Sequence, residues 1–318
     1  MFTINKKVIA AASSLAVLTL TATSFTPAQA APKNQARSVV SADWVEKNLN
    51  DPKVVIVEVS TEPGIYERGH IQNAVKISWH TDLVDTVNRD VVSAAKFQKF
   101  AQNAGISADS TVVLYGDKNN WFAAWGAWIF NLYGAKDVRI LDGGRVKWEK
   151  DGRAMTTAVP TKPKGNFTST RLDKSLRATL LQDIIPVAKK RVKVDLIDIR
   201  SADEYSGKIF APAGFQELAV RAGHIPGAIN VPWGLNVNAD GTFKTVAELK
   251  KLYADKGVDG KQPIITYCRI GERSSLTWFV LSEILGYDVK NYDGSWTEYG
   301  NTVGVPISNP SGTICGAN

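Results

Sequence analysis

Metal-binding and cross-linking residues are scarce in this sequence. Of its 318 residues only two are cysteine, Cys268 and Cys315, and only three are histidine. Exported proteins held by disulfides carry more cysteines, and Cys315 lies in a glycine-rich tail, so we expect packing to stabilise the fold without a bridge. No histidine, cysteine and carboxylate cluster has metal-ligand spacing, and the glycine patterns of dinucleotide and P-loop sites are missing. The sequence therefore predicts neither a metal nor a cofactor.

Long hydrophobic runs are also missing after the first thirty residues. Near the start, Lys6 and Lys7 precede the apolar run 8–20, and Ala28-Gln29-Ala30 has the pattern of a cleavage site. A membrane span needs about twenty apolar residues, so this run is too short to be an anchor. No cysteine near the cleavage point could carry a lipid. We expect a signal peptide over residues 1–30 and an exported bacterial protein, periplasmic or secreted, with no membrane attachment after cleavage.

Charge of one sign is not concentrated anywhere along the chain. The 38 Lys and Arg against 31 Asp and Glu give a formal charge of +7, which falls to +5 without Lys6 and Lys7. Nucleic-acid-binding proteins show a basic stripe or a known module, and neither is found, so we expect no nucleic-acid partner. The mild positive surplus fits a small anionic substrate.

An internal repeat of long period is the most informative feature. The segments VVIVEVS, YERGHIQNAVKISW, STVVLYGD and LYGAKDVRILDGG recur in the same order as VDLIDIRS, RAGHIPGAINVPW, QPIITYC and ILGYDVKNYDGS. Asp117 pairs with Cys268 and Asp142 with Asp293, both at an offset of 151. Agreement of several elements in order indicates a duplicated domain.

Both copies alternate short β-branched runs with segments of helical periodicity. The runs predicted as buried parallel strands are 54–59, 111–115, 194–199 and 263–267. The segments 94–104 and 246–256 have the apolar spacing of helices. This alternation predicts an α/β fold of two tandem domains, each a parallel β-sheet flanked by helices.

Domain limits follow from composition. We place the first domain at 37–155 and the second at 177–310. Between them, residues 156–176 are rich in Pro, Thr and Lys and are predicted to be the linker. Residues 311–318 form a tail.

Cys268 lies between a strand and a helix, after IITY and before RIGERSS. Backbone N–H groups and the helix dipole favour a thiolate at such a position. Arg269 and Arg273 should lower the thiol pKa further and can bind an anion, while Gly271 lets the loop curl around one centre. Two arginines beside an inert core cysteine would pack poorly, so we predict that Cys268 is a nucleophile.

The tandem organisation, the GHI elements, the DGG and DGS elements and the loop Cys-Arg-x-Gly-x-Arg resemble a thiosulfate sulfurtransferase of the rhodanese family. The resemblance covers residues from about 39 to about 307, and CRIGERS is its specific part. It implies an active-site loop that includes Ile270, Glu272 and Ser274. It also implies a catalytically inactive first copy, in agreement with Asp117 at the position paired with Cys268.

The resemblance assigns one further residue. Arg200 ends a predicted strand where the first copy has Ser60, and the corresponding arginine of the family helps to hold the anionic substrate. The alternative is a solvated arginine at a strand end. His70 and His224 occur in the GHI elements of both copies, including the inactive one, so we interpret them as structural.

The family chemistry implies a reaction in two half-reactions. The Cys268 thiolate attacks the outer sulfur of thiosulfate, sulfite leaves, and a thiophilic acceptor such as cyanide removes the sulfur from the persulfide. Arg269, Arg273 and Arg200 are expected to bind the sulfonate, with loop N–H groups stabilising the sulfur anion. No cofactor takes part.

Three alternatives compete with this interpretation. A 3-mercaptopyruvate sulfurtransferase usually has a short neutral residue after the cysteine, so Arg269 favours thiosulfate, although Glu272 departs from the commonest thiosulfate loop. A persulfide carrier or sensor would need the same loop without turnover. A cysteine-dependent phosphatase needs Cys-x5-Arg, whereas Arg273 gives Cys-x4-Arg and a smaller cradle.

Overall fold

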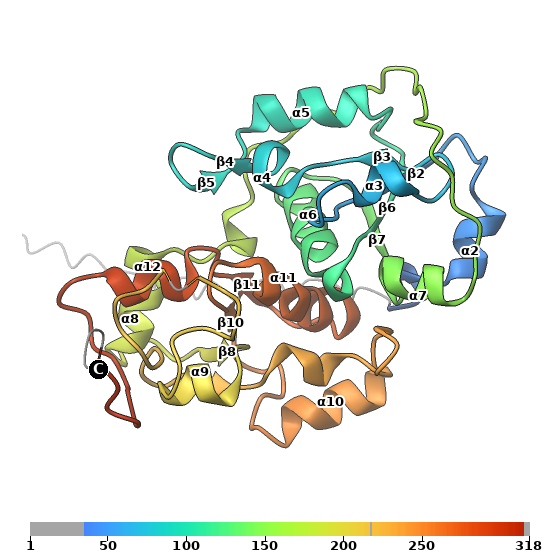
Figure 1. Cartoon of the computed structure of the whole chain (residues 1–318). Helices are drawn as coiled ribbons and strands as arrows, with labels where there is room; N and C mark the ends of the chain where they lie inside the picture. The colour runs from blue at the N-terminus through green and yellow to red at the C-terminus, as the bar shows by residue number, and fades with distance from the viewer. Residues whose placement is uncertain (1–34, 217, 315–318) are drawn as a thin grey trace, which may run out of the picture. The chain divides into compact units, whose positions relative to one another are not determined.

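A computed structural model describes residues 35–216 and 218–314 (Figure 1). The expected signal peptide and Cys315 lie outside these residues. Within the described ranges, no helix combines the length and apolar character that a membrane crossing requires.

The first half is built on a five-stranded parallel sheet with the order β1-β7-β6-β2-β3. Its strands are β1 (Val39–Val40), β2 (Val54–Glu58), β3 (Val75–Lys76), β6 (Thr111–Tyr115) and β7 (Asp137–Leu141). Alternate side chains of β2 and β6 enter separate cores, as the two-residue period of a strand requires. One core lies against α5 (Ala94–Asn103) and α6 (Trp121–Leu132), and the other against α2 (Ala42–Lys47) and α7 (Gly144–Lys150).

Short elements join these strands. They are α1 (Gln35–Ser38), α3 (Ile65–Arg68), α4 (Trp79–Asp82) and the 3-10 turn η1 (Lys118–Asn120). An antiparallel hairpin of β4 (Val84–Asp85) and β5 (Asp90–Val91) follows α4. This hairpin has no counterpart among the repeated segments of the sequence.

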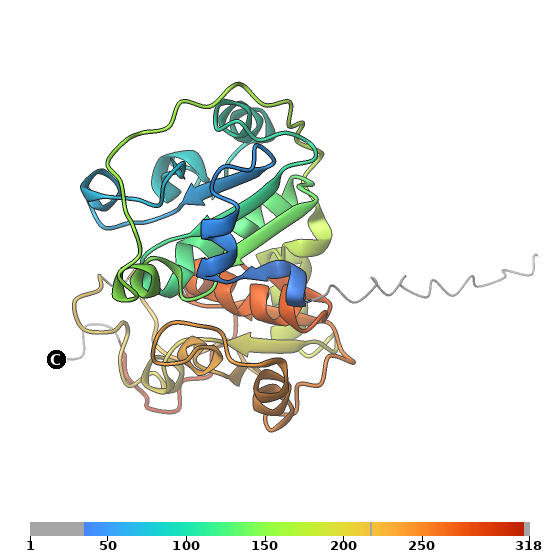
Figure 2. The same ribbon diagram turned by 90° about the vertical axis from the view of Figure 1, so that its right-hand side faces the viewer.

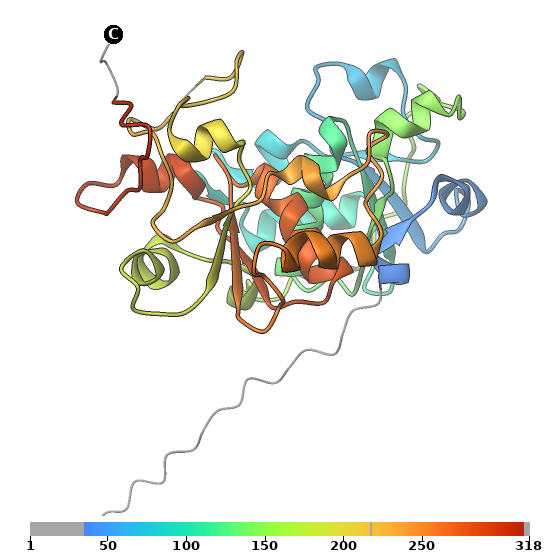
Figure 3. The ribbon, with the colours of Figure 1, turned by 90° about the horizontal axis from the view of Figure 1, so that it is seen from below.

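The second half, yellow-green to red in Figure 3, has a four-stranded parallel sheet with the order β11-β10-β8-β9. Its strands are β8 (Asp195–Asp198), β9 (Ile229–Asn230), β10 (Ile264–Tyr267) and β11 (Val289–Asn291). One core contains residues of α10 (Val246–Ala254) and of α11 (Glu272–Phe279) with its π-helical continuation η5 (Val280–Ile284). The other contains residues of η3 (Leu180–Ile184), α8 (Ile185–Ala188) and α12 (Ser295–Asn301). The remaining elements are η2 (Lys174–Leu176), α9 (Ala202–Ser206) and η4 (Trp233–Asn236).

The predicted α/β architecture is confirmed. All four predicted strands and both predicted helices are present, with ends that differ by at most two residues. Each strand of the two sheets pairs in parallel.

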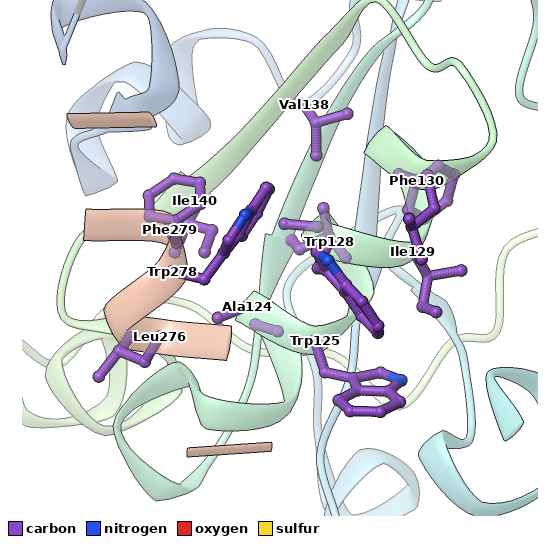
Figure 4. Packing of buried hydrophobic residues seen from close by; sticks show 14 of the residues in the cluster. Ala124, Trp125, Trp128, Ile129, Phe130, Val138, Ile140, Leu276, Trp278 and Phe279 are labelled. Atoms are coloured by element: carbon purple, nitrogen blue, oxygen red, sulfur yellow. The ribbon is translucent and has the colours of Figure 1, made fainter. Parts of the chain in front are cut away.

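Helices α6 and α11 join the two halves in one hydrophobic core. Figure 4 shows Ala124 and Trp128 of α6 beside Trp278 of α11, and all three are fully buried. Burying an aromatic side chain stabilises a fold by about 1.5–3 kcal/mol. Because α11 begins at Glu272, at the end of the loop that starts at Cys268, this shared core fixes the start of the helix that follows the predicted active-site loop.

The predicted linker packs against the first half over much of its length (Figure 2). Thr156 exchanges two main-chain hydrogen bonds with His70, of 2.8 and 2.9 Å. Farther along, the N–H of Phe167 donates to the carbonyl of Ile106, and the Phe167 ring is buried. The segment therefore connects the domains and also forms part of the first domain's surface.

Candidate active site

Cys268 is the first residue after β10, at the carboxyl edge of the second sheet. The loop from Cys268 turns at Gly271, whose φ of 101° lies in the left-handed region, and α11 begins at Glu272. A Cβ at Gly271 would lie 2.7 Å from the Trp125 ring and 2.8 Å from the Asp293 Cα. Both the conformation and the space therefore require glycine.

The sulfur of Cys268 is fully buried and has defined partners. The Gly271 N–H donates to Sγ at 3.0 Å, and the thiol donates to the Glu272 Oε2 at 3.6 Å. The Ser295 Oγ lies 4.0 Å from Sγ and accepts a hydrogen bond from the Cys268 N–H at 3.1 Å. A backbone donor and a carboxylate therefore meet at one sulfur atom.

The pKa of the Cys268 thiol is raised. Burial is the largest cause and the Glu272 carboxylate adds to it, while Arg273 and the backbone N–H groups of Ser274 and Gly271 act in the opposite direction. The sequence predicted a lowered pKa from two arginines, and for this conformation the prediction is wrong. The prediction did not include the complete burial of the thiol or the contact of Glu272 with the sulfur itself.

Arg269 points away from the sulfur. Its guanidinium donates to the carbonyl of Gln216 and lies 5.6 Å over the Phe215 ring. The side chain is half-buried at the edge of the loop. An anionic donor that reached the loop would meet this cation at its entrance.

Arg273 lies beneath the loop in a buried ion pair. Its guanidinium donates to both carboxylate oxygens of Glu204, at 3.1 and 3.3 Å. Burial raises the pKa of Glu204, but Arg273, the Ser201 N–H and Arg200 together lower it, and the pKa is lowered overall. Much of the Arg273 charge is thus compensated by Glu204.

Arg200 is also fully occupied by partners within the protein. It is 1% exposed, and its Nη2 lies 2.6 Å from the Asp198 Oδ2 and 2.7 Å from the Gly223 carbonyl. Its guanidinium lies 4.7 Å over the Trp296 ring. The Arg200 side chain is therefore not solvated, and its guanidinium is not free to bind a substrate in this conformation. A role of Arg200 in binding the donor stays a prediction.

The remaining predicted loop residues support the loop. Ile270 is half-buried, and Ser274 is buried with its hydroxyl donating to the Gly271 carbonyl at 2.9 Å. The histidines have the structural setting that their repetition predicted. The His70 ring stacks on Tyr66 and the His224 ring on Tyr205, and each ring has a nitrogen within hydrogen-bonding distance of that tyrosine's carbonyl.

The repeat pairing of Cys268 needs a correction of one residue. The Trp296 N–H donates to the Cys268 carbonyl at 3.0 Å, and in the first half the Arg145 N–H donates to the Gly116 carbonyl at the same distance. Gly116, and not Asp117, is therefore the counterpart of Cys268. The sequence pairing was wrong because both residues follow the same strand and a gap of one residue separates the copies.

The first half has no room for a nucleophile at this position. A Cβ at Gly116 would lie 2.2 Å from the Val59 carbonyl oxygen. The carboxylate of Asp117 accepts hydrogen bonds from the Thr61 and Glu62 N–H groups at 2.9–3.1 Å. These contacts agree with an inactive first copy.

Comparison with known proteins decides the family. The rhodanese-like domain matches this chain twice, at residues 41–151 and 185–302. The chain belongs to the rhodanese family of sulfurtransferases. Both matches lie inside the two predicted domains.

Three similar proteins illustrate the range of this rhodanese chain's relatives. A Mycolicibacterium smegmatis protein, provisionally named a thiosulfate sulfurtransferase, is 54% identical over 271 residues, which cover 85% of this chain and 96% of that protein. A Thermus thermophilus protein named as a sulfur carrier is 52% identical over 275 residues, with the same two shares. The structure of SseA from Escherichia coli, described among 3-mercaptopyruvate sulfotransferases, has a TM-score of 0.69 and 27% identity, covering 81% of this chain and 98% of that one.

Sequence reasoning missed two residues at the rhodanese loop. Ser295, which supports Cys268, has a φ of 53°, unusual for a residue other than glycine. Its counterpart in the first half is Gly144, so the change from DGG to DGS between the copies was a usable signal. Arg89, from the β4–β5 hairpin of the first half, donates to the Ile270 carbonyl at 2.7 Å, and no local sequence pattern pointed to it.

Proposed function

We propose that this rhodanese is a thiosulfate sulfurtransferase that passes sulfane sulfur to a thiophilic acceptor, such as cyanide, through a persulfide on Cys268. The observation that carries the proposal is the 3.0 Å hydrogen bond from the Gly271 N–H to Sγ at the start of α11. A donor fixed at a helix N-terminus stabilises negative charge on sulfur in both the thiolate and the persulfide.

The proposed reaction has two half-reactions, and this geometry supports a sulfur anion in each of them. The Cys268 thiolate attacks the outer sulfur of thiosulfate, the sulfur–sulfur bond of the donor breaks, and sulfite leaves with the bonding electrons. The acceptor then attacks the outer sulfur of the persulfide and releases the thiolate. Arg269 at the edge of the loop supplies the cation that favours a dianionic donor.

A sulfur carrier is the second candidate function. The Thermus thermophilus relative bears that name at 52% identity and matches over 96% of its own length. A carrier needs the same buried cysteine and the same loop, and differs in passing its sulfur only to a partner protein. A steady rate with a small acceptor distinguishes an enzyme from a carrier.

The experiment is thiocyanate formation from cyanide with thiosulfate or 3-mercaptopyruvate as donor. Wild-type protein should turn over thiosulfate, Cys268→Ser should not, and Arg269→Ala should have a raised KM for thiosulfate. Arg68→Ala is a matched control, because this exposed arginine pairs with Glu62 and the Pro63 carbonyl of its own loop in the first half. Preference for 3-mercaptopyruvate would overturn the donor assignment, and persulfide formation without turnover would favour the carrier.

We also propose that the protein is exported. The support is the basic start, apolar run and small-residue cleavage pattern within residues 1–30. The mature protein should begin at Ala31 when it is purified from the native host and its N-terminus is sequenced. Recovery of a protein that still begins at Met1, only in the cell interior, would contradict export.

A further inference from the structure

The Glu272 carboxylate is directed at the reactive sulfur. Its Oε2 lies 3.6 Å from Sγ, and the residue is 4% exposed. The other recorded contact is with Arg273, whose Nε is 3.9 Å from Oε1, a long distance for a charged pair. The guanidinium nitrogens of Arg273 instead bind Glu204. A buried carboxylate normally has several close donors, and this one has the thiol.

A carboxylate in this place is unfavourable for an anionic donor unless its charge is removed during the reaction. Thiosulfate and sulfite are both anions, and a charged carboxylate in contact with Sγ would repel either of them strongly in a buried site. Transfer of the thiol proton to Glu272 removes this repulsion. It moves the single negative charge of the pair from the carboxylate to the sulfur, where the charge is needed.

We propose that Glu272 is the catalytic base of both half-reactions, taking the proton of Cys268 in the first and the proton of a protonated acceptor, such as a thiol, in the second; this rests on the proposed function. In the first half-reaction Glu272 takes the proton of Cys268, the thiolate attacks thiosulfate, and sulfite leaves with the electrons of the broken bond. Sulfite leaves as the dianion, and the protonated Glu272 then loses its proton to solvent.

The second half-reaction uses the same base. A thiol acceptor arrives with its proton, Glu272 takes that proton, and the acceptor sulfur attacks the outer sulfur of the Cys268 persulfide. The new persulfide leaves with the sulfane sulfur, and the Cys268 thiolate receives the proton back from Glu272. Atoms and electrons balance without an external oxidant or reductant.

The surrounding charges fit this assignment. Arg273 is compensated by Glu204, and behind the loop Asp293 is paired bidentately with Arg177 at 2.8 Å. Arg89 and Arg269 hold backbone carbonyls of Ile270 and Gln216. Among the described residues, Glu272 is the carboxylate recorded in contact with Sγ.

The test compares two acceptors on protein already loaded with sulfur from thiosulfate, with the persulfide content checked by intact mass. A small thiol must lose a proton to react, whereas sulfite reacts as an anion. Glu272→Gln should slow transfer to the thiol about a hundredfold, as expected for loss of a general base, and leave transfer to sulfite nearly unchanged. The thiol rate should also become steeper with pH in the variant, because solvent must then remove the proton.

Glu204→Gln is the matched control, since it removes another buried carboxylate of the same cluster that does not touch Sγ. Glu204→Gln should change the transfer rates to the thiol and to sulfite by the same factor. Should Glu272→Gln not fold, Glu272→Asp withdraws the carboxylate from Sγ and should show the same selective loss. Equal slowing of thiol and sulfite, or no slowing, overturns the assignment of Glu272. Failure of the wild type to form a persulfide from thiosulfate would instead overturn the proposed function.

Discussion

Arg145 in the first half and Arg200 in the second each form an ion pair with the carboxylate that ends a sheet strand, although the two arginines occupy different positions in the repeat. Arg145 reaches from α7 to the Glu58 carboxylate at the end of β2, at 2.8 Å. In the second half Trp296 stands at the position of Arg145, and Arg200 pairs with the Asp198 carboxylate while stacking on that tryptophan. The duplicated fold therefore keeps a buried arginine on the carboxylate that ends β2 in one half and β8 in the other, which explains an arginine at position 200 without a substrate.

Removal of Arg200 should therefore destabilise the protein. Arg200→Ala leaves the Asp198 carboxylate buried and unpaired, at a cost of about 3–5 kcal/mol in the free energy of unfolding. Denaturant unfolding of Arg200→Ala and of Arg145→Ala measures this cost in each domain. A fully stable Arg200→Ala with a strongly raised KM for thiosulfate would show that Arg200 serves the substrate instead.

The raised pKa of Cys268 predicts slow alkylation at neutral pH. A raised thiol pKa means that less thiolate is present at pH 7 than in an ordinary cysteine, so the rate with iodoacetamide should increase about tenfold per pH unit up to that pKa. An alkylation rate that has already reached its plateau at pH 7 would contradict a raised pKa.

The β4–β5 hairpin should control access to the loop. Arg89 holds the Ile270 carbonyl, and Asp90 pairs with Arg177 at 2.6 Å, so the hairpin is attached to the second half at two points. Because Sγ is fully buried, release of Arg89 should expose it. Cys268 should be alkylated several-fold faster in Arg89→Ala than in wild type, and at the wild-type rate in Arg68→Ala. Equal rates in wild type and Arg89→Ala would show that the hairpin does not control access to Cys268.

Ser295 should show an unusual order of stability among its variants. Ser295→Ala retains the positive φ, which costs on the order of 1–3 kcal/mol, and also leaves the buried Cys268 N–H without its acceptor. Ser295→Gly loses the same acceptor but relieves the backbone. Ser295→Gly should therefore have a higher unfolding temperature than Ser295→Ala. Both variants should transfer sulfur more slowly than wild type. An Ala variant more stable than the Gly variant would contradict this interpretation.

Much of the architecture could be predicted because local pattern and repetition agreed. The strands are nearly continuous apolar runs, and the two copies of each motif confirmed one another, so the tandem α/β domains followed from the sequence. The loop around Cys268 was equally clear, since a thiol, a glycine and two arginines in six residues have few other uses.

The electrostatics of the site could not be predicted in the same way. Whether Arg273 acts on Cys268 depends on Glu204, and whether Arg200 is free depends on Asp198, and both pairings are set by the folded sheet. Arg89 acts on a residue 181 positions away. A one-residue gap between the copies also hid Gly116 as the counterpart of Cys268.

The most direct measurement is the intact mass of the mature protein after incubation with thiosulfate and again after addition of cyanide. Wild-type protein should gain the mass of one sulfur atom, located on the Cys268 peptide, and lose it to cyanide as thiocyanate, while Cys268→Ser remains unchanged throughout. No mass gain in the wild type, or an equal gain in the Cys268→Ser variant, would contradict sulfur transfer through Cys268.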